Sequence, residues 1–460
     1  MKKRQILSLF IVFVSVLLII SGCANSKKDT SDERIPVSGI LDDISSENSS
    51  SASDTTESSS ENTQYSSDSN NSSQGTSSTP TSSSSSPSSN TTSNGNTSLT
   101  ESSKFVMPKM YTDSCVIQQN STINIWGKFE GSEKLTLIFN GKEYYTQCNN
   151  GEFSFKVNTP AASKKAYEIV IHNGKYKKTI RNVAVGEVFL MGGQSNMVFF
   201  NVELSTQPPE ATDGGNQWIR FTNTQPIGKR TETPQEYQGT WYVTSNGTFP
   251  GMSAFCSWFS RKMYKELNVP IGVVTCAMSD SSLAAWLTET DAAKLNNENT
   301  SISTPYYQHT PGQLYNTILY SFLKYTFHGA VWYQGESSTA ATYEKNLETF
   351  IKCWRNYLNA PNLPFVIVQL PGYEINQDWP ATREAQKNVC NKLENCAYTV
   401  NIDLGEKGNI HPQDKKPAAE RAASAMLNLV FGKNEPKPAL FKSATKQGSN
   451  IVLKFNNASN

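Results

Sequence analysis

The sequence predicts an α/β protein built on a doubly wound, mostly parallel sheet and preceded by a small antiparallel β-sandwich. From Val185 onward, strand-like and helix-like segments alternate, which is the pattern of a parallel sheet covered on both faces. Between residues 104 and 184, short strand-like runs are separated by turn residues, which is typical of a small sandwich. Much of the N-terminal quarter has a composition that does not support a core, so we expect the folded part to begin near residue 104.

Residues 1–23 have the organisation of a secretory leader. The basic residues Lys2–Arg4 precede the apolar run Ile6–Ile20, which is too short to span a membrane comfortably. The segment ends in Ile20–Cys23, which resembles a bacterial lipobox, and this resemblance implies cleavage before Cys23 and lipidation of its thiol. We therefore expect the mature protein to be anchored through Cys23 at the extracellular face of a bacterial cell membrane. The alternative is an ordinary signal peptide that leaves Cys23 free.

Residues 24–103 are rich in Ser, Thr, Asn and Gly and contain almost no aliphatic side chains. Such a segment buries too little apolar surface to offset the entropy that it would lose on ordering, so we expect a disordered linker. Its role would be to hold the folded part away from the membrane.

Residues 104–184 are expected to form the β-sandwich module. Asn-Gly pairs occur between the predicted strands, at Asn140–Gly141, Asn150–Gly151 and Asn173–Gly174, and such pairs favour tight hairpin turns. Apolar and polar residues alternate along parts of the strands, which indicates one buried face for each. The clearest strand candidates are 122–126, 135–139, 152–157 and 167–171.

Residues 185–432 are expected to form the doubly wound domain, in which each predicted strand ends in a polar or glycine-rich loop. The final stretch, 433–460, contains one more strand-like run, 450–455, without a partner, so we expect the start of a truncated C-terminal β region. In the domain, predicted strands cover 185–191, 271–276, 329–333, 365–370 and 397–402, and predicted helices cover 254–266, 315–326, 341–358, 382–393 and 417–429.

The charge balance and the cysteines exclude several kinds of partner. The chain has 41 Lys and Arg against 40 Asp and Glu, a net charge of +1, which gives no electrostatic case for nucleic acid. Apart from Cys23, no two cysteines form a Cys-x-x-Cys pair with metal spacing. Disulfides such as Cys115 to Cys148 or Cys390 to Cys396 are compatible with the sequence, and so are simple buried thiols.

The stretch Gly186–Met197 carries the first chemical motif. Its apolar run, Val188–Met191, stops at two glycines and is followed by Ser195. In an α/β sheet, ligands bind beyond the carboxyl ends of the strands, so Ser195 is a candidate nucleophile. The alternative is a polar turn in which Ser195 or Asn196 caps the next helix. Met197 stands where the nucleophile elbow of α/β-hydrolases has its second glycine, which argues against that elbow.

A serine nucleophile needs a base within hydrogen-bond reach, normally a neutral histidine, and the chain has four histidines. His411 follows the predicted strand 397–402 and would therefore lie at the correct edge of the sheet, so we predict that it is the base. His172 lies in a sandwich strand and His328 at the amino end of a strand. For His309 we expect a surface loop, and the alternative is a loop that lines the site.

Three carboxylates compete for the role of orienting His411. Asp403 emerges at the carboxyl end of the preceding strand and is our first choice. Glu336 follows a neighbouring strand, and Glu406 stands in the same loop as His411. A Ser-His dyad helped by a backbone carbonyl is a further alternative.

Several stretches give the chain a resemblance to the sialate O-acetylesterases, a form of the SGNH hydrolases. Gly193–Met197 resembles the first sequence block of that family. The resemblance covers roughly residues 104–455 and implies an SGNH-hydrolase, flavodoxin-like sheet that needs no metal or organic cofactor. The other matching stretches are Trp332–Ser337, similar to the Trp-Tyr-Gln-Gly-Glu signature; His411–Pro412 with Lys415 and Arg421, similar to the last block; and Pro108–Gln119 with Ile125–Gly127, similar to the N-terminal β module.

The resemblance also implies an oxyanion hole. One donor would be the backbone N–H of Ser195 and a second the amide of Gln334, with Glu336 positioning the site. A third would be a backbone N–H in the loop of Ser279 and Asp280, where the family usually has two glycines. Glycine reaches conformations that Ser and Asp adopt only at a cost, so activity or substrate choice could differ here.

These observations predict an extracellular serine esterase that removes O-acetyl groups from a sugar or polysaccharide. Ser195 would attack the acetyl carbonyl, and His411 would carry the proton to the sugar oxygen before water hydrolyses the acetyl-enzyme. One alternative is an acetyl esterase for plant polysaccharides such as xylan. Another is a non-catalytic glycan-binding lipoprotein, because Ser279 and Asp280 replace the glycines and Gly408 stands where SGNH enzymes commonly have an aspartate, three residues before the histidine.

Overall fold

The computed structural model describes residues 98–205, 215–223, 233–237, 239–296, 309–374 and 378–457. The predicted leader, Cys23 and most of the predicted linker lie outside these ranges. Strand β1 (Thr100–Glu101) lies inside the stretch that the sequence predicted to be a linker. Its residues pair with Tyr176 and Lys177 and are therefore ordered as a strand. Residues 100 and 101 therefore belong to the β structure. In the described part of the chain, no helix has both the length and the apolar composition required to cross a bilayer.

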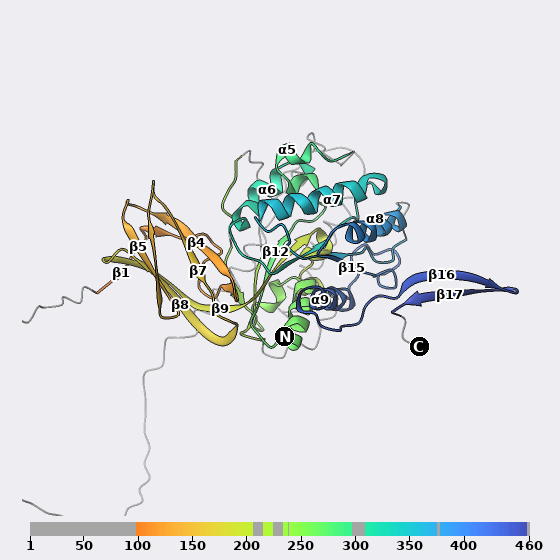
Figure 1. The fold of residues 1–460 in the computed structure, drawn as a ribbon, viewed down its shortest axis with the longest axis horizontal. Coiled ribbons are helices and arrows are strands. Elements are labelled where there is room, and N and C mark those ends of the chain that lie inside the picture. The colour runs from red at the N-terminus through yellow and green to blue at the C-terminus, as the bar shows by residue number, and fades with distance from the viewer. Residues whose placement is uncertain are drawn as a thin grey trace, which may run out of the picture. The chain divides into compact units, whose positions relative to one another are not determined.

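Strand β9 (Tyr176–Gly193) connects the two regions of the fold, and Figure 1 shows it between the module and the helices. Its first half pairs with the module, for example Ala184 with Val116 of strand β3. Its second half pairs with strands of the doubly wound domain, for example Gly193 with Ala277. The prediction of a strand at 185–191 thus identified only the downstream half of one 18-residue strand.

The N-terminal module consists of two sheets whose inner faces share one apolar core. One sheet contains strands β2, β4 and β7, and the other continues into β9 through β8, β5 and β6. Along β7, buried and exposed residues alternate, as the sequence pattern predicted. Asn140 and Gly141 join β5 to β6 with positive φ angles of 49° and 73°, which is the turn geometry that Asn-Gly favours. The strands are β2 (Phe105–Val106), β3 (Val116–Gln118), β4 (Thr122–Phe129), β5 (Lys134–Phe139), β6 (Lys142–Gln147), β7 (Glu152–Asn158) and β8 (Ser163–His172).

The central sheet of the second region has the strand order β11-β10-β12-β9-β13-β14-β15. All neighbouring pairs are parallel except β10 with β11, so the prediction of a mostly parallel sheet is confirmed. The sequence pattern missed β10 because Arg220 interrupts its short apolar run, although this side chain is buried and donates to the carbonyl of Ser114 at 3.1 Å. The strands are β10 (Ile219–Asn223), β11 (Tyr242–Val243), β12 (Ile271–Ala277), β13 (Gly329–Tyr333), β14 (Phe365–Val368) and β15 (Cys396–Thr399).

Helices cover both faces of this sheet, and in Figure 1 helices α7 and α9 lie on opposite sides of its strands. Alternate residues of β9 enter different cores: Val188 and Leu190 pack with residues of α7 and α8, whereas Phe189 and Met191 pack with residues of α4 and α9. A strand buried on both faces explains its continuous apolar sequence. The α-helices are α3 (Ser195–Val198), α4 (Ala254–Leu267), α5 (Glu289–Ala292), α6 (Gln313–Thr317), α7 (Ala340–Tyr357), α8 (Trp379–Lys392) and α9 (Lys416–Phe431), and the 3₁₀ turns are η1 (Asn201–Glu203), η3 (Phe249–Gly251), η4 (Ala284–Trp286) and η6 (Leu319–Phe322).

One predicted helix is broken in the structure. The stretch 315–326 forms the end of α6 and the 3₁₀ turn η6, separated at Ile318, whose φ of −129° and ψ of −67° are not helical. Thr317 and Ile318 are β-branched and stand at the break, and such residues lose side-chain freedom in a helix.

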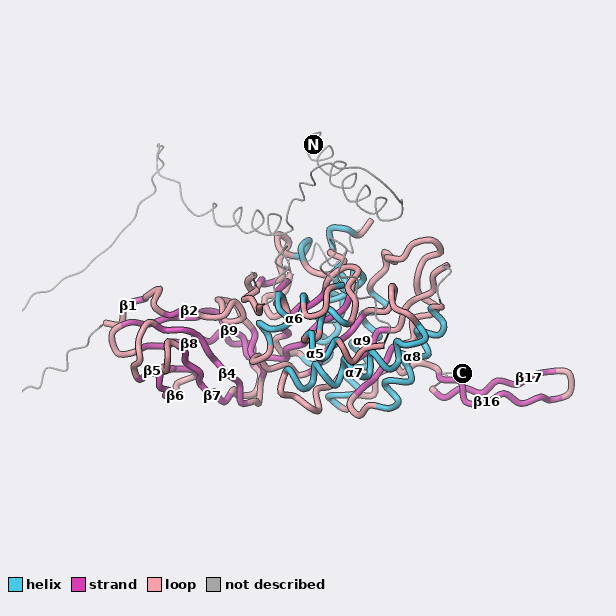
Figure 2. Tube along the Cα trace, turned by 90° about the horizontal axis from the view of Figure 1, so that it is seen from above, coloured by secondary structure: helices cyan, strands magenta, loops and turns pink. Residues whose placement is uncertain are grey.

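The C-terminal residues form a two-stranded antiparallel ribbon of β16 (Leu440–Gln447) and β17 (Asn450–Asn456), which is seen from above in Figure 2. The strand-like run at 450–455 therefore has a partner, contrary to the prediction. The sequence 440–447 was missed because lysines and polar residues interrupt its apolar pattern. Phe441 and Ile451 on the ribbon are 61% and 70% exposed.

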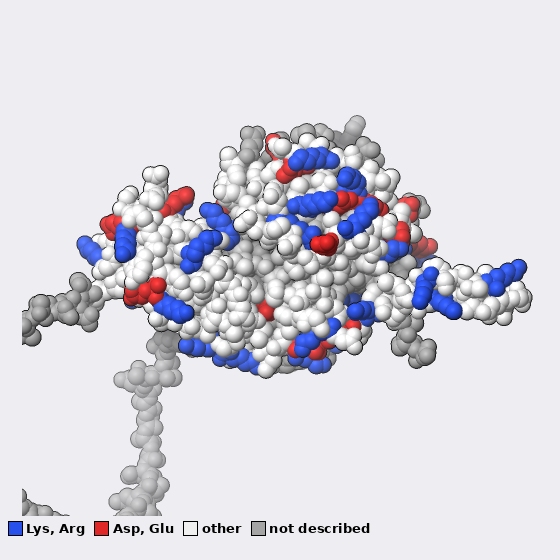
Figure 3. Space-filling view, in the orientation of Figure 1, with Lys and Arg blue, Asp and Glu red and all other residues white. Residues whose placement is uncertain are grey.

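All seven described cysteines are free. Cys390 and Cys396 lie close together, with their sulfur atoms 2.9 Å apart, but they are not joined by a disulfide, and neither are Cys115 and Cys148. Acidic and basic side chains are interspersed on the face drawn in Figure 3, in line with the nearly balanced charge of the sequence.

Candidate active site

The nucleophile loop begins where β9 and β13 approach each other most closely. A Cβ atom on Gly193 would lie 2.1 Å from the carbonyl oxygen of Tyr333, so only glycine fits at this position. The next residue, Gln194, donates its backbone N–H to the same carbonyl at 2.9 Å. Ser195 follows as the first residue of the short helix α3, at the carboxyl edge of the sheet. Gly193 therefore fixes the place at which the chain leaves the strand before Ser195.

Ser195 and His411 form a hydrogen-bonded pair. The Oγ atom of Ser195 lies 2.7 Å from Nε2 of His411, which comes from the loop between β15 and α9. This distance is within the range in which a histidine accepts the proton of a serine hydroxyl. The structure thus brings together the two residues that the sequence predicted as nucleophile and base, although they are far apart along the chain.

The electrostatic surroundings keep His411 neutral. Burial lowers the pKa of His411 to about 4, and the positive charge of Lys415 adds to this effect. A neutral imidazole has a lone pair with which to accept a proton, so His411 is in the form that a base requires at neutral pH. The ring of Phe199 lies beside it, with the ring centroids 6.1 Å apart.

Asp403 does not orient His411, contrary to our first choice. Both of its carboxylate oxygens accept hydrogen bonds from Arg421 at 2.6 Å. This ion pair holds the Asp403 side chain at the surface, where it is 58% exposed. Among the described residues, no carboxylate contacts Nδ1 of His411. The structure therefore contains the Ser-His dyad that the sequence left as an alternative.

Glu406 shapes the loop that carries His411. Its carboxylate accepts a hydrogen bond from the Asn409 side chain at 2.8 Å and another from the backbone N–H of Gln413. The side-chain oxygen of Asn409 accepts a hydrogen bond from the backbone N–H of His411 at 3.0 Å. Glu406 thus acts on the backbone around the base and not on its imidazole ring.

A buried polar cluster joins the nucleophile loop to the loop of the base. The fully buried side chain of Asn196 donates to Glu336 Oε1 at 2.7 Å and to the carbonyl oxygen of Ile410 at 3.1 Å. Its oxygen accepts a hydrogen bond from Nζ of Lys415 at 2.6 Å. Because Asn196 follows Ser195 directly and Ile410 precedes His411, the cluster sets how the dyad residues face each other.

Both charged members of this cluster have shifted pKa values. Burial raises the pKa of Glu336, although its hydrogen bond from Asn196 and the charge of Lys415 oppose the shift. Burial lowers the pKa of Lys415 to about 7, against the opposing effects of Glu336, Glu406 and Glu203. From the sequence, Asn196 was considered only as a helix cap and as part of the first motif, and Lys415 only as part of the last motif. The sequence feature that could have identified both residues is their position, since each lies within four residues of Ser195 or His411.

Gln334 lies beside the site, but its amide is already engaged. Its Nε2 donates to the carbonyl of Ser281 at 3.4 Å and to the hydroxyl of Ser338 at 3.1 Å. Its Oε1 lies 2.7 Å from the hydroxyl of Tyr343. The predicted donation from Gln334 to an oxyanion would therefore require one of these bonds to be exchanged.

The loop after β12 places Asp280 at the same edge of the sheet. Asp280 has a φ of 54°, so the position where the family usually has glycine is indeed in the left-handed region. Among the described residues, neither its backbone N–H nor those of Ser195 and Ser279 bond to an acceptor, so these groups are free to donate to an oxyanion. The loop is fixed at Met278, whose N–H donates to the carbonyl of Gly193 at 3.1 Å.

The Asp280 side chain has two partners of its own. Its Oδ1 accepts a hydrogen bond from the Ser337 hydroxyl at 3.1 Å, and its Oδ2 lies 3.2 Å from Nε2 of His309. Burial opposes ionisation, but the interactions with His309 and Ser337 outweigh it and lower the pKa of Asp280. His309, which the sequence placed in a surface loop, is only 7% exposed.

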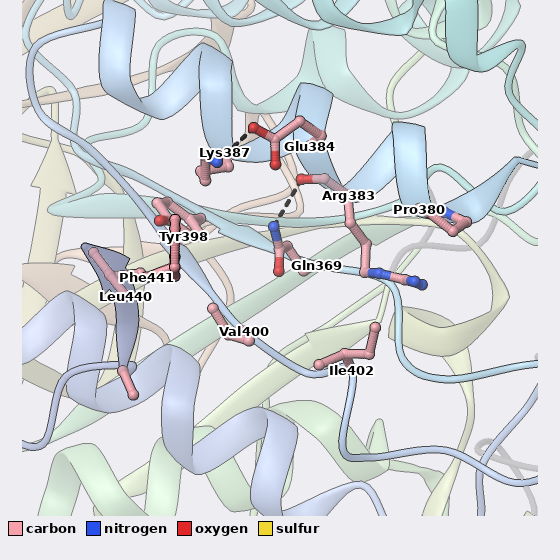
Figure 4. A pocket seen from close by; sticks show the side chains of 11 residues that line it. Gln369, Pro380, Arg383, Glu384, Lys387, Tyr398, Val400, Ile402, Leu440 and Phe441 are labelled. Carbon is pink, nitrogen blue, oxygen red and sulfur yellow. Dashed lines mark hydrogen bonds and ion pairs between the residues drawn. The ribbon is translucent and has the colours of Figure 1, made fainter. Parts of the chain in front are cut away.

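A surface cavity of about 300 Å³ lies elsewhere, between α8, β15 and the start of β16 (Figure 4). Arg383, Lys387, Tyr398 and Phe441 are among the residues that line it, and neither Ser195 nor His411 belongs to the lining. Among the described residues, no three His, Cys, Asp or Glu side chains gather in a way that could hold a metal ion.

A serine at the end of a parallel strand, hydrogen-bonded to a histidine from another loop at the same edge of the sheet, is typical of α/β serine hydrolases. The comparisons narrow this class further. The chain belongs to the carbohydrate esterase family of sialic acid-specific acetylesterases, whose family model matches residues 185–428. The family and the fold class expected from the sequence motifs are therefore confirmed.

Individual relatives support the same placement. The sialate O-acetylesterase of Homo sapiens is 26% identical over an alignment of 288 residues, and the match covers 55% of this chain and 55% of that protein. The sialate O-acetylesterase of Mus musculus is 25% identical over 315 residues, with coverage of 55% and 58%. The chain thus spans about half the length of the curated relatives that it matches.

The fold has a counterpart among solved structures. A carbohydrate acetylesterase from Xanthomonas citri has a TM-score of 0.69 with this chain at 24% sequence identity. The match covers 76% of this chain and 81% of that one, so it includes more than the doubly wound domain.

Proposed function

We propose that the protein is a serine carbohydrate O-acetylesterase of the sialate O-acetylesterase type. The 2.7 Å contact between Ser195 Oγ and His411 Nε2 carries this proposal. It is supported by the family to which residues 185–428 belong. An O-acetylated sugar or polysaccharide would be the substrate, and acetate and the free sugar hydroxyl the products.

The dyad suits acyl transfer in two steps. His411 takes the proton from Ser195 as the serine oxygen attacks the acetyl carbonyl, and it then gives this proton to the departing sugar oxygen. A water molecule, deprotonated by His411, next attacks the acetyl-enzyme, and His411 returns this proton to Ser195 Oγ as the acyl–oxygen bond breaks and acetate leaves. The imidazolium formed in each step has no carboxylate partner among the described residues, so its stabilisation would come from surrounding dipoles.

The negative charge on the carbonyl oxygen would be held by backbone donors. The N–H groups of Ser195 and Asp280 have no acceptor among the described residues and belong to loops that meet at the end of β9. Loss of one oxyanion donor typically costs on the order of 3 kcal/mol of transition-state stabilisation. Two backbone donors would serve even while Gln334 keeps its bonds to Ser281 and Ser338.

The proposed location is the extracellular face of a bacterial membrane, with a lipid on Cys23. Support comes from the basic, apolar and small residues of segment 1–23 and from the Ser-rich stretch that follows it. Metabolic labelling with a fatty acid analogue tests this part: label should appear in the parent and be lost in Cys23→Ala. Equal labelling of both would contradict lipidation at Cys23.

The activity is tested by p-nitrophenyl acetate hydrolysis with the full chain and its variants Ser195→Ala and His411→Ala. Each variant should lose about 10⁴-fold or more in kcat, because both residues take part in every turnover. His172→Ala is the matched control, since His172 ends strand β8 in the module. A folded parent that is no faster than Ser195→Ala would favour a non-catalytic glycan-binding protein instead.

A further inference from the structure

Asp280 lies in a loop at the edge of the sheet where the nucleophile loop begins. Strands β12 and β13 flank β9, and Ala277 and Tyr333 are both in register with Gly193, two residues before the nucleophile. Asp280 follows Ala277 by three residues, and Ser337 follows Tyr333 by four. The hydrogen bond from Ser337 to Asp280 therefore links the two loops that border the end of β9.

The loop that carries Asp280 is fixed on both sides of this residue. Met278 donates its N–H to the carbonyl of Gly193 at 3.1 Å, and the carbonyl of Ser281 accepts from Gln334 at 3.4 Å. The hydroxyl of Ser281 also accepts the indole N–H of Trp286 at 3.0 Å. Asp280 itself remains 56% exposed at its side chain. A fixed loop thus presents a solvent-accessible carboxylate at the edge of the sheet that carries the nucleophile.

The partners of Asp280 hold the carboxylate in place without covering it. Its Oδ2 lies 3.2 Å from Nε2 of His309, and its Oδ1 accepts a hydrogen bond from the Ser337 hydroxyl. Among the described residues, Nδ1 of His309 is buried and has no hydrogen-bond partner. Burial opposes ionisation of Asp280, but the interactions with His309 and Ser337 lower its pKa, so the side chain is a carboxylate at neutral pH.

A sugar whose acetyl group reaches Ser195 places its neighbouring substituents near this carboxylate. We propose that Asp280 is a specificity-determining residue that selects uncharged O-acetylated sugars and disfavours sugars that carry a carboxylate of their own. Hydroxyl groups of a neutral sugar can donate to Asp280, while a second carboxylate is repelled by it. This inference rests on the proposed esterase function and narrows its substrate class to neutral sugars, which departs from the sialic acid specificity in the name of the matching family.

The test compares two forms of one substrate that differ in charge alone. An O-acetylated sialic acid and its carboxamide, in which the carboxylate is replaced by a neutral amide, are hydrolysed by the full chain under the same conditions. The parent should show a kcat/KM about tenfold higher for the amide, as expected for one repulsive contact in a partly solvated site. A parent that prefers the acid, or that treats both alike, would overturn the inference.

The Asp280→Asn variant removes the charge, and asparagine also tolerates a positive φ. Its ratio of kcat/KM for amide over acid should fall to about one, and Asp113→Asn, an equal change of net charge in the module, should keep the parental ratio. An unchanged ratio in Asp280→Asn would contradict the assignment. Ser337→Ala retains the carboxylate and should keep the preference for the amide.

Ionic strength provides a measurement that needs no variant. Charge repulsion between accessible groups is screened by salt, so the parental ratio should fall toward one in about 1 M NaCl. A preference that survives high salt would be steric and would contradict a role for the Asp280 charge. If the parent hydrolyses neither sugar nor p-nitrophenyl acetate, the esterase proposal itself fails.

Discussion

The role of His411 as a base and its low pKa have opposite effects on proton transfer. His411 must accept a proton from Ser195, yet burial and the charge of Lys415 lower its pKa to about 4. A base whose pKa lies well below the working pH is fully deprotonated but accepts a proton less readily than a base with a pKa near 7, so the imidazolium should be short-lived in this site. Lys415 adds a second influence, because it also fixes Asn196, the neighbour of the nucleophile, through a 2.6 Å hydrogen bond.

The pH dependence of the parent and of Lys415→Met separates these two influences. The parent should keep its kcat/KM as pH falls from 7 and lose half of it near pH 4, because only neutral His411 is active. In Lys415→Met the acid limb should move to higher pH, since the charge that lowers the pKa of His411 is gone. The variant should also lose about 10- to 100-fold in kcat through misplacement of Asn196.

Hydrolysis of p-nitrophenyl acetate between pH 3.5 and 8 at constant ionic strength measures both effects. Lys442→Met, an exposed lysine of strand β16, is the control and should match the parent. A Lys415→Met variant that is slower but keeps the parental acid limb would show that Lys415 acts on geometry alone.

At this scale the sequence predicted some site residues and missed others. Ser195 and His411 were predicted because strand ends and a shortage of histidines restrict the choice. Asp403 was wrong: its position at the correct sheet edge is visible in the sequence, but its pairing with Arg421, 18 residues later on a helix, depends on packing. The partners of Asn196 could not be predicted either, since they lie 140 and 219 residues away.

Among the elements, the close contact of β9 with β13 is the most demanding. Gly193 has a φ of 146° and no room for a Cβ atom, which would lie 2.1 Å from the Tyr333 carbonyl. Gly174, in a turn of the module, also has a positive φ, 93°, but nothing lies within 4 Å of an added Cβ. Gly193 and Gly174 therefore both need a positive φ angle, but only Gly193 has no room for a Cβ atom.

Replacing each of them by alanine isolates the steric part. Gly193→Ala should lower the free energy of unfolding by about 2 kcal/mol more than Gly174→Ala, because backbone must move to admit the methyl group. It should also reduce esterase activity, while Gly174→Ala should not. Urea unfolding and p-nitrophenyl acetate hydrolysis measure the two outcomes, and equal effects of both substitutions would contradict the steric argument.

Elements whose apolar residues repeat with one clear helical or strand spacing were predicted well. Helix α7 was expected at 341–358 and spans Ala340–Tyr357, because a long amphipathic pattern is hard to mistake. Strand β10 and the break at Ile318 were missed, since each depends on a local exception: a buried arginine and a single non-helical residue. The ribbon of β16 and β17 was half recognised because its first strand is too polar to stand out.

For the whole molecule, the junction between module and sheet depends on a buried carboxylate. Glu187 of β9 is 1% exposed and accepts a hydrogen bond from Gln118 at 2.8 Å. Gln119 and His328 bond to the same carboxylate, so two segments that are far apart in the sequence converge on this residue of β9. One apolar core also extends from module residues such as Ile125 to the sheet.

Glu187→Ala should therefore destabilise the entire fold. The substitution leaves two amide donors and an imidazole without their acceptor, at a cost of about 3 kcal/mol. Because the core is shared, module and sheet should unfold in one transition in the parent. Urea unfolding followed by both fluorescence and circular dichroism tests this, with Glu168→Ala, an exposed residue of β8, as control. A loss below about 1 kcal/mol would contradict the role of Glu187.

The broad architecture was more accessible to prediction than this junction. Alternation of strands and helices and the spacing of Asn-Gly turns indicated both regions and their order, because such patterns are local. That one strand would serve both regions could not be predicted, because Gly186 and Glu187 look like a boundary in the sequence. They are instead the middle of β9.

The continuity of β9 also limits how this chain can change in evolution. Successive residues of a strand point to opposite faces, so inserting one residue between Tyr176 and Gly186 would put the two halves of β9 out of phase. Either the module would lose its pairing or Ser195 would turn away from His411. Length changes are thus confined to the loops, and a recombination that exchanges the module must join the parental genes within β9, in the same register.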